Sequence, residues 1–139
     1  MSEIILFDFW RSSASYRVRI VLNLKNVPYT RLPTSLLDNA QRAPDYVVRN
    51  PQGFVPMLSI DGYDLTQSLA IIDYLDAKFP EPPMVSSDPA ERSRTLAQAL
   101  VIAADIHPLN NLRVLRYLRD VLGQEQSAVD DWYRHWIIE

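Results

Sequence analysis

The sequence contains no cysteine, and this absence removes a whole class of chemistry. Without cysteine there can be no disulfide, no thiolate-bound metal ion and no thiol nucleophile carried by the protein itself. Only two histidines are present, His107 and His135, and they lie too far apart to show the spacing of a ligand pair. We therefore predict no metal site of the zinc type.

Glycine is also scarce, with three residues in 139. A glycine-rich phosphate loop is absent, so we do not expect nucleotide binding. The net charge of −3 gives no overall attraction for nucleic acid or an anionic membrane, so any anion site must be local. Twelve of the fourteen basic residues are arginines, which suit bidentate contacts with carboxylates but are also ordinary surface residues.

The N-terminal residues "MSEIILFDFW" carry no basic leader and form no membrane span, so we expect the protein in the cytoplasm. The hydrophobic pattern of the first 80 residues predicts, in order, a buried strand over 3–9, a helix beginning near Ser12, a strand after Pro28, a short helix near 43–48, a hairpin of 57–60 and 63–65, and an amphipathic helix over 66–79. This order is that of a thioredoxin-like α/β domain.

Residues 81–89 are rich in proline and predict a linker. The remaining residues, 90–139, show no strand signal, so an all-α domain should follow. We expect one long helix over 90–122 that is bent or broken at Pro108, a C-cap at Gly123, and another helix beginning at Gln124.

Three local features of the α/β domain favour the binding of an anion or a peptide. The first is the junction from Trp10 to Tyr16, where a strand meets a helix N-terminus that carries serines. The second is Pro56 in "FVPML", which is either a cis proline or a strand-edge proline. The third is Gln67-Ser68, at the start of the helix over 66–79. Each feature also has a purely structural interpretation, since serine and its neighbours commonly cap helices.

The same features, in the same order, resemble those of the zeta-class glutathione transferases, which include the maleylacetoacetate and maleylpyruvate isomerases. "WRSSASYRVRIVLNLK" resembles the family's SSCx(W/H)RVR signature, "NPQGFVPML" its NPxxxVPxL segment, and "LTQSLAIIDYL" its glutamine–serine helix. "DIHPLNNLRVLRYL" resembles a segment in the first helix of the family's second domain. The resemblance runs along the whole chain and implies a glutathione-dependent enzyme that forms homodimers.

The resemblance also implies roles for individual residues. Ser12 would hydrogen-bond the glutathione thiolate, and the backbone of Val55, ahead of a cis Pro56, would pair with the cysteinyl moiety. Gln67 and Ser68 would hold the γ-glutamyl carboxylate, and Gln41 would contact the glycyl end. The remaining implied residues line the glutathione pocket (Ser13, Ala14, Ser15, Tyr16, Arg17), line the active site from the helical domain (His107, Asn111, Arg113), or bind the substrate carboxylates (Arg11, Arg113).

The implied reaction is the cis–trans isomerisation of a conjugated diacid, either maleylacetoacetate or maleylpyruvate. A thiolate that adds to the double bond leaves a rotatable single bond, and its elimination returns the trans product. The chain departs from the family pattern at Ala14, where the family usually has cysteine, and at its end, where the family continues through more helices. We expect the helical domain to be incomplete and to expose apolar faces.

Other interpretations remain open at this stage. The site would also suit glutathione conjugation or dehalogenation of small electrophilic acids, and the fold alone would suit a non-catalytic binding module. His107 beside Pro108 can simply satisfy a loosened carbonyl, and Arg113 can lie on a solvated helix face. Trp132 and Trp136, four residues apart, are expected to pack.

Overall fold

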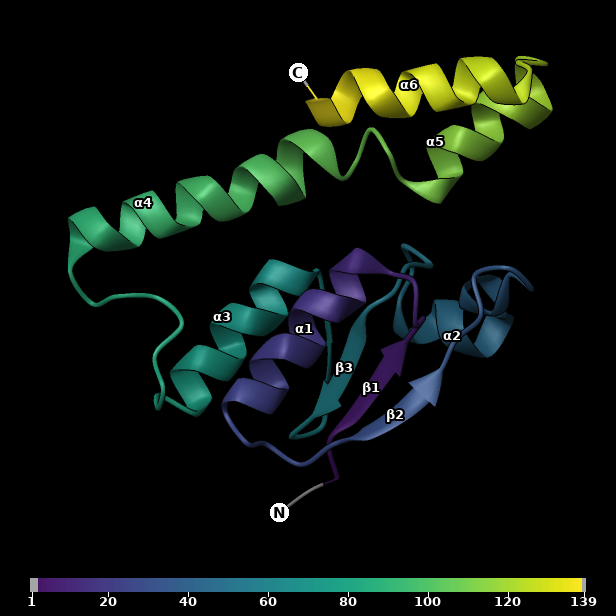
Figure 1. The fold of residues 1–139 in the computed structure, drawn as a ribbon. Helices are drawn as coiled ribbons and strands as arrows, with labels where there is room; N and C mark the ends of the chain where they lie inside the picture. Colours follow the sequence, from purple (N-terminus) through teal and green to yellow (C-terminus); the bar gives the residue numbers. More distant parts are fainter. Residues whose placement is uncertain (1–2, 139) are drawn as a thin grey trace. The chain divides into compact units, whose positions relative to one another are not determined.

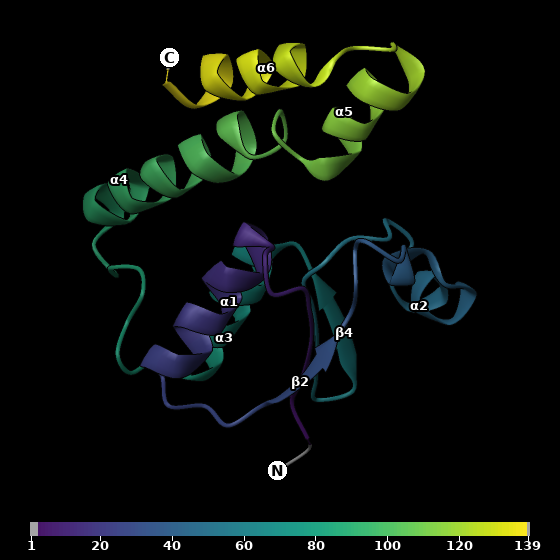
Figure 2. The same ribbon diagram turned by 45° about the vertical axis from the view of Figure 1, so that its right-hand side comes forward.

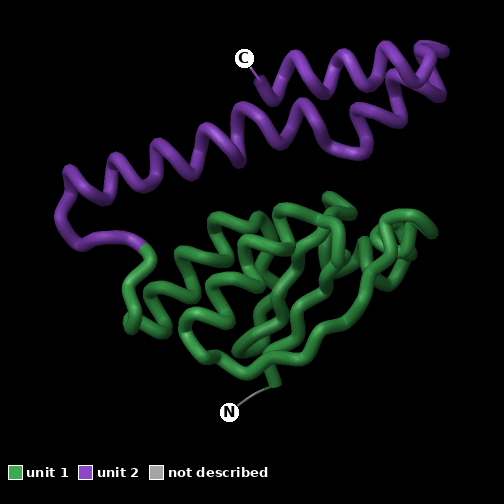
Figure 3. Tube along the Cα trace, viewed as in Figure 1, with its two compact units in different colours: residues 1–84 green, residues 85–139 purple. Residues whose placement is uncertain are grey.

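The computed structural model describes residues 3–138. The chain divides into two units, one that ends at Met84 and one that begins at Val85 (Figure 3). The division falls within the proline-rich segment. Each unit is described here by itself.

The first unit has the thioredoxin-like element order expected from the sequence. Its elements are β1 (Ile5–Asp8), α1 (Ser13–Leu24), β2 (Thr30–Pro33), a 3-10 helix (Ala40–Arg42), α2 (Pro44–Arg49), β3 (Met57–Ile60), β4 (Tyr63–Thr66) and α3 (Ser68–Lys78). The strand order in the sheet is β2-β1-β3-β4. β1 pairs parallel with β2 and antiparallel with β3, and β3 pairs antiparallel with β4, so that β2 and β4 form the two edges (Figure 2).

The parallel pair and the hairpin arise from different local signals. Because β1 and β2 run parallel, the chain must cross over between them, and α1 is that crossover. β3 and β4 are joined by Asp61 and Gly62, whose φ angles of +52° and +82° are those of a type I′ hairpin turn. Both features were predicted from the sequence.

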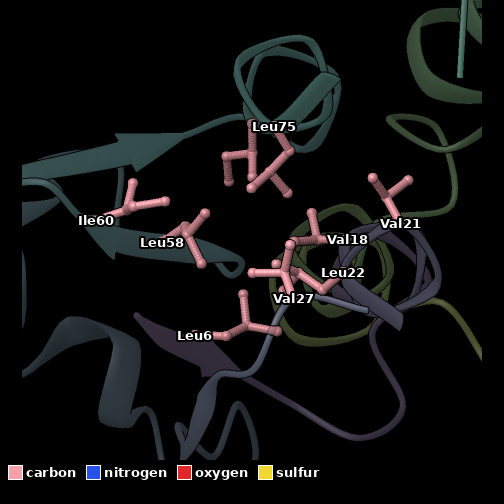
Figure 4. Close-up of a cluster of buried hydrophobic side chains, with 9 residues drawn as sticks. Leu6, Val18, Val21, Leu22, Val27, Leu58, Ile60 and Leu75 are labelled. Atoms are coloured by element: carbon pink, nitrogen blue, oxygen red, sulfur yellow. The ribbon is translucent and has the colours of Figure 1, made fainter. Parts of the chain in front are cut away.

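The main core lies between the sheet and the two helices α1 and α3, which lie side by side on one face (Figure 1). Alternation along β1 sends Leu6 to this face and Phe7 to the other, as the strand period of two requires. The first cluster consists of Leu6, Val18, Val21, Leu22, Val27, Leu58, Ile60, Ile71 and Leu75 (Figure 4). A smaller cluster on the other face joins Phe7 to Tyr46 of α2, Val55 and Met57.

Helix α1 ends one turn before Pro28, as expected, but its terminator is an asparagine rather than a glycine. Asn26 adopts a left-handed φ of +51°. The next amide, that of Val27, donates to the carbonyl oxygen of Leu22 at 3.0 Å and closes the helix end. Asparagine is the residue that most often replaces glycine in this conformation.

The second unit contains α4 (Pro89–Leu100), which continues as a π-helical segment (Val101–Ile106), then α5 (Leu112–Arg116), which continues as a π-helical segment (Tyr117–Val121), and finally α6 (Gln126–Ile138). The expected break at Pro108 is confirmed, and it extends to Asn111, whose side chain caps α5. Gly123 has a φ of +63°, as a residue just beyond a helix end requires. α6 begins at Gln126, two residues later than expected.

The second unit has a small core. Among its described residues, Leu115 and Val129 are the only hydrophobic ones that are buried. Trp132 packs as expected, since its Nε1 donates to the carbonyl oxygen of Leu109 at 2.8 Å and its ring lies 5.7 Å from that of Trp136. Large apolar side chains are exposed on α4, on α6 and on or next to the two π-helical segments, as predicted; they include Leu100, Val101, Ile102, Tyr117, Val121, Leu122, Ile137 and Ile138.

Candidate active site

Ser12 is the residue at which β1 has ended and α1 begins. Its backbone amide donates to the carbonyl oxygen of Phe9 at 2.9 Å, which turns the chain into the helix. Its Oγ accepts a hydrogen bond from the amide of Ser15 at 3.1 Å, so Ser12 is the N-cap of α1. A hydroxyl that accepts one hydrogen bond still has its own hydrogen to donate. Ser12 can therefore cap the helix and hydrogen-bond an anion at the same time.

The pocket-lining residues expected after Ser12 differ in exposure. Ser13 and Tyr16 present exposed side chains, whereas Ala14 and Ser15 are buried on the core face of α1. Arg17 is half-buried, and its Nε has no hydrogen-bond partner among the described residues. Burial lowers the pKa of the Arg17 guanidinium below its ordinary value, so this side chain would gain from a nearby anion.

The charge around this junction is opposite in sign to the net charge of the chain. Residues 8–19 contain three arginines and one acidic residue, Asp8, although the whole chain carries −3. Arg11 is exposed in the loop before Ser12, with its guanidinium 5.7 Å from the ring of Trp10. The local anion site that the overall charge made necessary thus has a matching local field.

Val55 and Pro56 are joined by a cis peptide bond at the start of β3, as one of the two sequence interpretations required. Val55 is buried, in the cluster on the α2 face of the sheet. The pairing of its backbone with a ligand stays a prediction.

Gln67 precedes α3 rather than lying in its first turn, which corrects the sequence expectation. Its backbone adopts φ +67° and ψ +113°, a conformation that residues other than glycine rarely adopt. Its Nε2 donates to Oε1 of Gln52 at 2.8 Å. Ser68, the first residue of α3, is buried. Strain of this kind gathers at ligand-binding positions, so Gln67 is a good candidate for one.

Gln41 lies in the 3-10 helix, with 7% of its surface exposed and with no hydrogen-bond partner for its Oε1 among the described residues. The chain of Gly53 passes close by. A Cβ at Gly53 would lie 3.0 Å from the Gln41 carbonyl oxygen and 2.9 Å from Nη1 of Arg42. The segment that leads into Pro56 therefore passes the 3-10 helix too closely to admit a side chain at position 53.

Sheet topology brings three of these features to one end of the sheet. β1 finishes and β3 starts at this end because the two strands are antiparallel, with Phe7 opposite Met57. β4 is antiparallel to β3 and ends there too, with Thr66 opposite Met57. One end of the sheet therefore carries the Ser12 junction, the cis Pro56 and the start of α3 at Gln67.

The candidates of the second unit lie at the break between α4 and α5. The backbone amide of His107 donates to the Ile102 carbonyl oxygen at 2.9 Å and closes the π-helical segment. Oδ1 of Asn111 accepts from the Arg113 amide at 3.1 Å, so Asn111 caps α5. Arg113 is exposed. Their contact with substrate stays a prediction.

Sequence reasoning missed two groups of residues near the site. Gln52, which holds Gln67, has no local signal. Asp8 and Arg19 form a buried ion pair at the end of β1. Here a signal was available, because a carboxylate that ends an otherwise apolar strand needs a partner.

A search against known families matches residues 2–77 to the glutathione S-transferase N-terminal domain. This match covers more than half of the chain, and the sheet, the Ser12 junction and the cis proline lie within it. The chain belongs to the glutathione S-transferase family.

Relatives of this glutathione S-transferase chain confirm the resemblance found in its motifs. It is 46% identical over 138 residues to a maleylacetoacetate isomerase of Rhizobium meliloti, covering 99% of the chain and 65% of the relative. It is similar to the holo structure of a maleylpyruvate isomerase, a bacterial zeta-class transferase, with a TM-score of 0.93 and 41% identity, covering 96% of the chain and 63% of that structure.

A third relative is a crystal structure of maleylacetoacetate isomerase from Methylobacterium extorquens with bound malonate and glutathione. The TM-score is 0.93 and the identity 39%, over 96% of the chain and 63% of that structure. The chain thus spans slightly less than two thirds of the length of these relatives. In the described part of this transferase, no helix is long and apolar enough to cross a bilayer, and no cluster of three acidic or histidine side chains could hold a metal ion.

Proposed function

We propose that this chain binds glutathione and, with it, catalyses the cis–trans isomerisation of a conjugated diacid such as maleylacetoacetate or maleylpyruvate. The observation that carries the proposal is the geometry of Ser12, whose hydroxyl caps α1 and keeps a hydrogen to donate at the positive end of that helix. Relatives at 39–46% identity bear the names of these isomerases, and one of them holds glutathione together with the dicarboxylate malonate.

The residues at this end of the sheet, together with Gln41, fit the chemical groups of glutathione. The start of α3, with the strained Gln67 and with Ser68, offers backbone amides and side chains to the γ-glutamyl carboxylate. The Oε1 of Gln41 has no hydrogen-bond partner among the described residues and would accept from the N–H of the glycyl moiety. Backbone atoms of Val55, next to the cis bond, would pair with the cysteinyl moiety.

Glutathione, when bound, supplies the thiolate that adds to the double bond of the diacid and is later eliminated from the adduct, which re-forms the double bond. Ser12 donates its hydroxyl hydrogen to the sulfur, which stabilises the thiolate over the thiol. The N-terminus of α1 and the local excess of arginine act in the same direction. Arg11, in the loop before Ser12, would hold a carboxylate of the diacid and offset the negative charge that develops there.

The same site would serve a second reaction class, conjugation or dehalogenation of small electrophilic acids, because it needs the same thiolate. Product analysis separates the two, since isomerisation returns free glutathione and conjugation consumes it. A non-catalytic binding module would show neither. The homodimer and the cytoplasmic location stay predictions.

The test follows the ultraviolet absorbance of maleylpyruvate mixed with the chain, with and without glutathione. We expect loss of the cis diacid only when glutathione is present. Ser12→Ala should raise the pKa of the bound thiol by about one unit and so lower the rate at neutral pH by up to about tenfold.

The control variant is Ser12→Thr, which keeps both the hydroxyl donor and the capping oxygen and should retain most of the activity. Isomerisation that is equally fast without glutathione, or a Ser12→Ala variant as active as the parent, would refute the proposal.

A further inference from the structure

A buried ionic cluster at the end of β1 has no part in the mechanism above. Asp8 is 1% exposed, yet it carries a carboxylate. Its Oδ1 accepts from Nη1 of Arg19 at 2.6 Å, and its Oδ2 accepts from Nε of Arg31 at 2.7 Å. Buried ion pairs are often no more stabilising than apolar residues of the same size. Stability alone is therefore a weak explanation for this cluster.

Arg19 makes a second contact that ties the cluster to the loop before Ser12. Its Nη2 donates to the backbone carbonyl oxygen of Trp10 at 3.2 Å, and its guanidinium lies 5.2 Å from the ring of Tyr16. The Trp10 side chain itself is 69% exposed, so its burial does little to order the loop. The loop is held instead through its backbone, by a side chain of α1.

Arg31 shares the carboxylate of Asp8 but not the loop. It lies in β2, where it pairs in register with Leu6 of β1, and its side chain is 48% exposed. Within residues 3–138, its hydrogen bond and ion pair are with Asp8 alone. Removing either arginine takes one partner from the same carboxylate, but only removal of Arg19 also releases the Trp10 carbonyl. The two residues therefore form a matched pair for experiment.

We propose that Asp8 and Arg19 are positioning residues that fix the orientation of the Ser12 hydroxyl. Asp8 holds one nitrogen of the Arg19 guanidinium, and the planar guanidinium directs its other nitrogen to the Trp10 carbonyl, two residues before Ser12. A hydroxyl that must meet a thiolate needs placement to within a fraction of an ångström. This inference rests on the proposed function and adds residues that contact neither glutathione nor the diacid.

The experiment compares Arg19→Lys, Arg19→Gln and Arg31→Gln with the parent chain. The readout is the pKa of the glutathione thiol in the complex, followed by the ultraviolet absorbance of its thiolate across pH. Lysine can keep the ion pair with Asp8, but it has one nitrogen and lacks the rigid fork that directs a second nitrogen to the Trp10 carbonyl. We expect both Arg19 variants to raise the bound thiol pKa by about one unit, which at neutral pH lowers the rate up to about tenfold.

Arg31→Gln should lose stability without shifting that pKa, and glutathione affinity should change little in any variant. A second readout needs no ligand: hydrogen exchange of the Ser12 amide should accelerate in both Arg19 variants and stay unchanged in Arg31→Gln. Equal effects of Arg19 and Arg31 substitution, or unchanged exchange in the Arg19 variants, would overturn the inference. If the parent chain binds no glutathione, the proposed function fails on that result, and exchange still decides whether Arg19 orders the loop.

Discussion

Replacing Lys25 by methionine should cost the first unit a large part of its stability. The chain has only two lysines, and Lys25 has a fully buried side chain. Its ammonium donates to Oδ1 of Asp76 at 2.7 Å, to the Phe79 carbonyl oxygen at 2.6 Å and to the Pro82 carbonyl oxygen at 2.8 Å. These three acceptors use all three of its hydrogens. The contacts join the end of α1 to α3 and to the segment that follows it.

The magnitude follows from what the substitution leaves behind. Removing one partner of a buried ion pair costs about 3–5 kcal/mol, because the other charge stays buried without compensation. The side chain of Asp76 is 14% exposed and still accepts the Met84 amide at 2.8 Å, so the lower end of this range applies. A loss of about 3 kcal/mol lowers the melting temperature of an 80-residue unit by about 12 °C or more.

The assay is urea unfolding followed by circular dichroism, with Lys78→Met as the control. Lys78 also pairs with an aspartate, Asp61, but its side chain is 37% exposed, so its loss should barely move the midpoint. The double variant Lys25→Met/Asp76→Leu should recover part of the lost stability. A Lys25→Met variant that loses less than about 1 kcal/mol, or no more than the control, would refute the reasoning.

Three further predictions concern a glycine, a carboxylate and an arginine. Gly53→Ala should destabilise the chain more than Gly62→Ala: both have positive φ, worth about 1–2 kcal/mol, but only at Gly53 would a Cβ meet a guanidinium nitrogen at 2.9 Å and a carbonyl oxygen at 3.0 Å. A hydrogen bond from Arg49 lowers the pKa of Asp64 below its ordinary 3.8. The pair should stabilise the fold by less than about 1 kcal/mol, in full above pH 3.8, and this contribution is lost as the pH falls through the lowered pKa. The melting curves of Asp64→Asn and the parent should therefore converge at that low pH. Arg113→Ala should raise KM for the diacid much more than KM for glutathione, as steady-state kinetics would show.

Most of the first unit could be predicted because its signals are local. A short apolar run marks β1, a two-residue turn at Asp61 and Gly62 fixes the hairpin, and Pro28 limits α1. The left-handed φ of Gln67 could not be predicted, since it depends on how the end of β4 meets α3. The partners of Asp8 depend on pairing between strands distant in sequence. In the second unit, Pro108 revealed a break but not its length.

Candidate site residues divide along the same line. The serine at 12 and the proline at 56 were found because helix starts and X-Pro bonds have sequence signals of their own. The sequence motifs do not indicate that these features lie at the same end of the sheet. That follows from the antiparallel pairing of β3 with β1 and β4. Sheet order therefore turns three weak local signals into one candidate site.

The absence of cysteine at position 14 is compatible with the proposed site, although the family usually has cysteine there. Ala14, where the family usually has cysteine, lies on the core face of α1 and is 9% exposed. Burial would raise the pKa of a thiol at that position, although the N-terminus of α1 would act in the opposite direction. The hydroxyl of Ser12, two residues earlier, lies instead at the N-terminus of α1, where an external thiolate is stabilised. In the proposed function glutathione supplies the thiol, so alanine at this position removes no group that the proposed reaction needs.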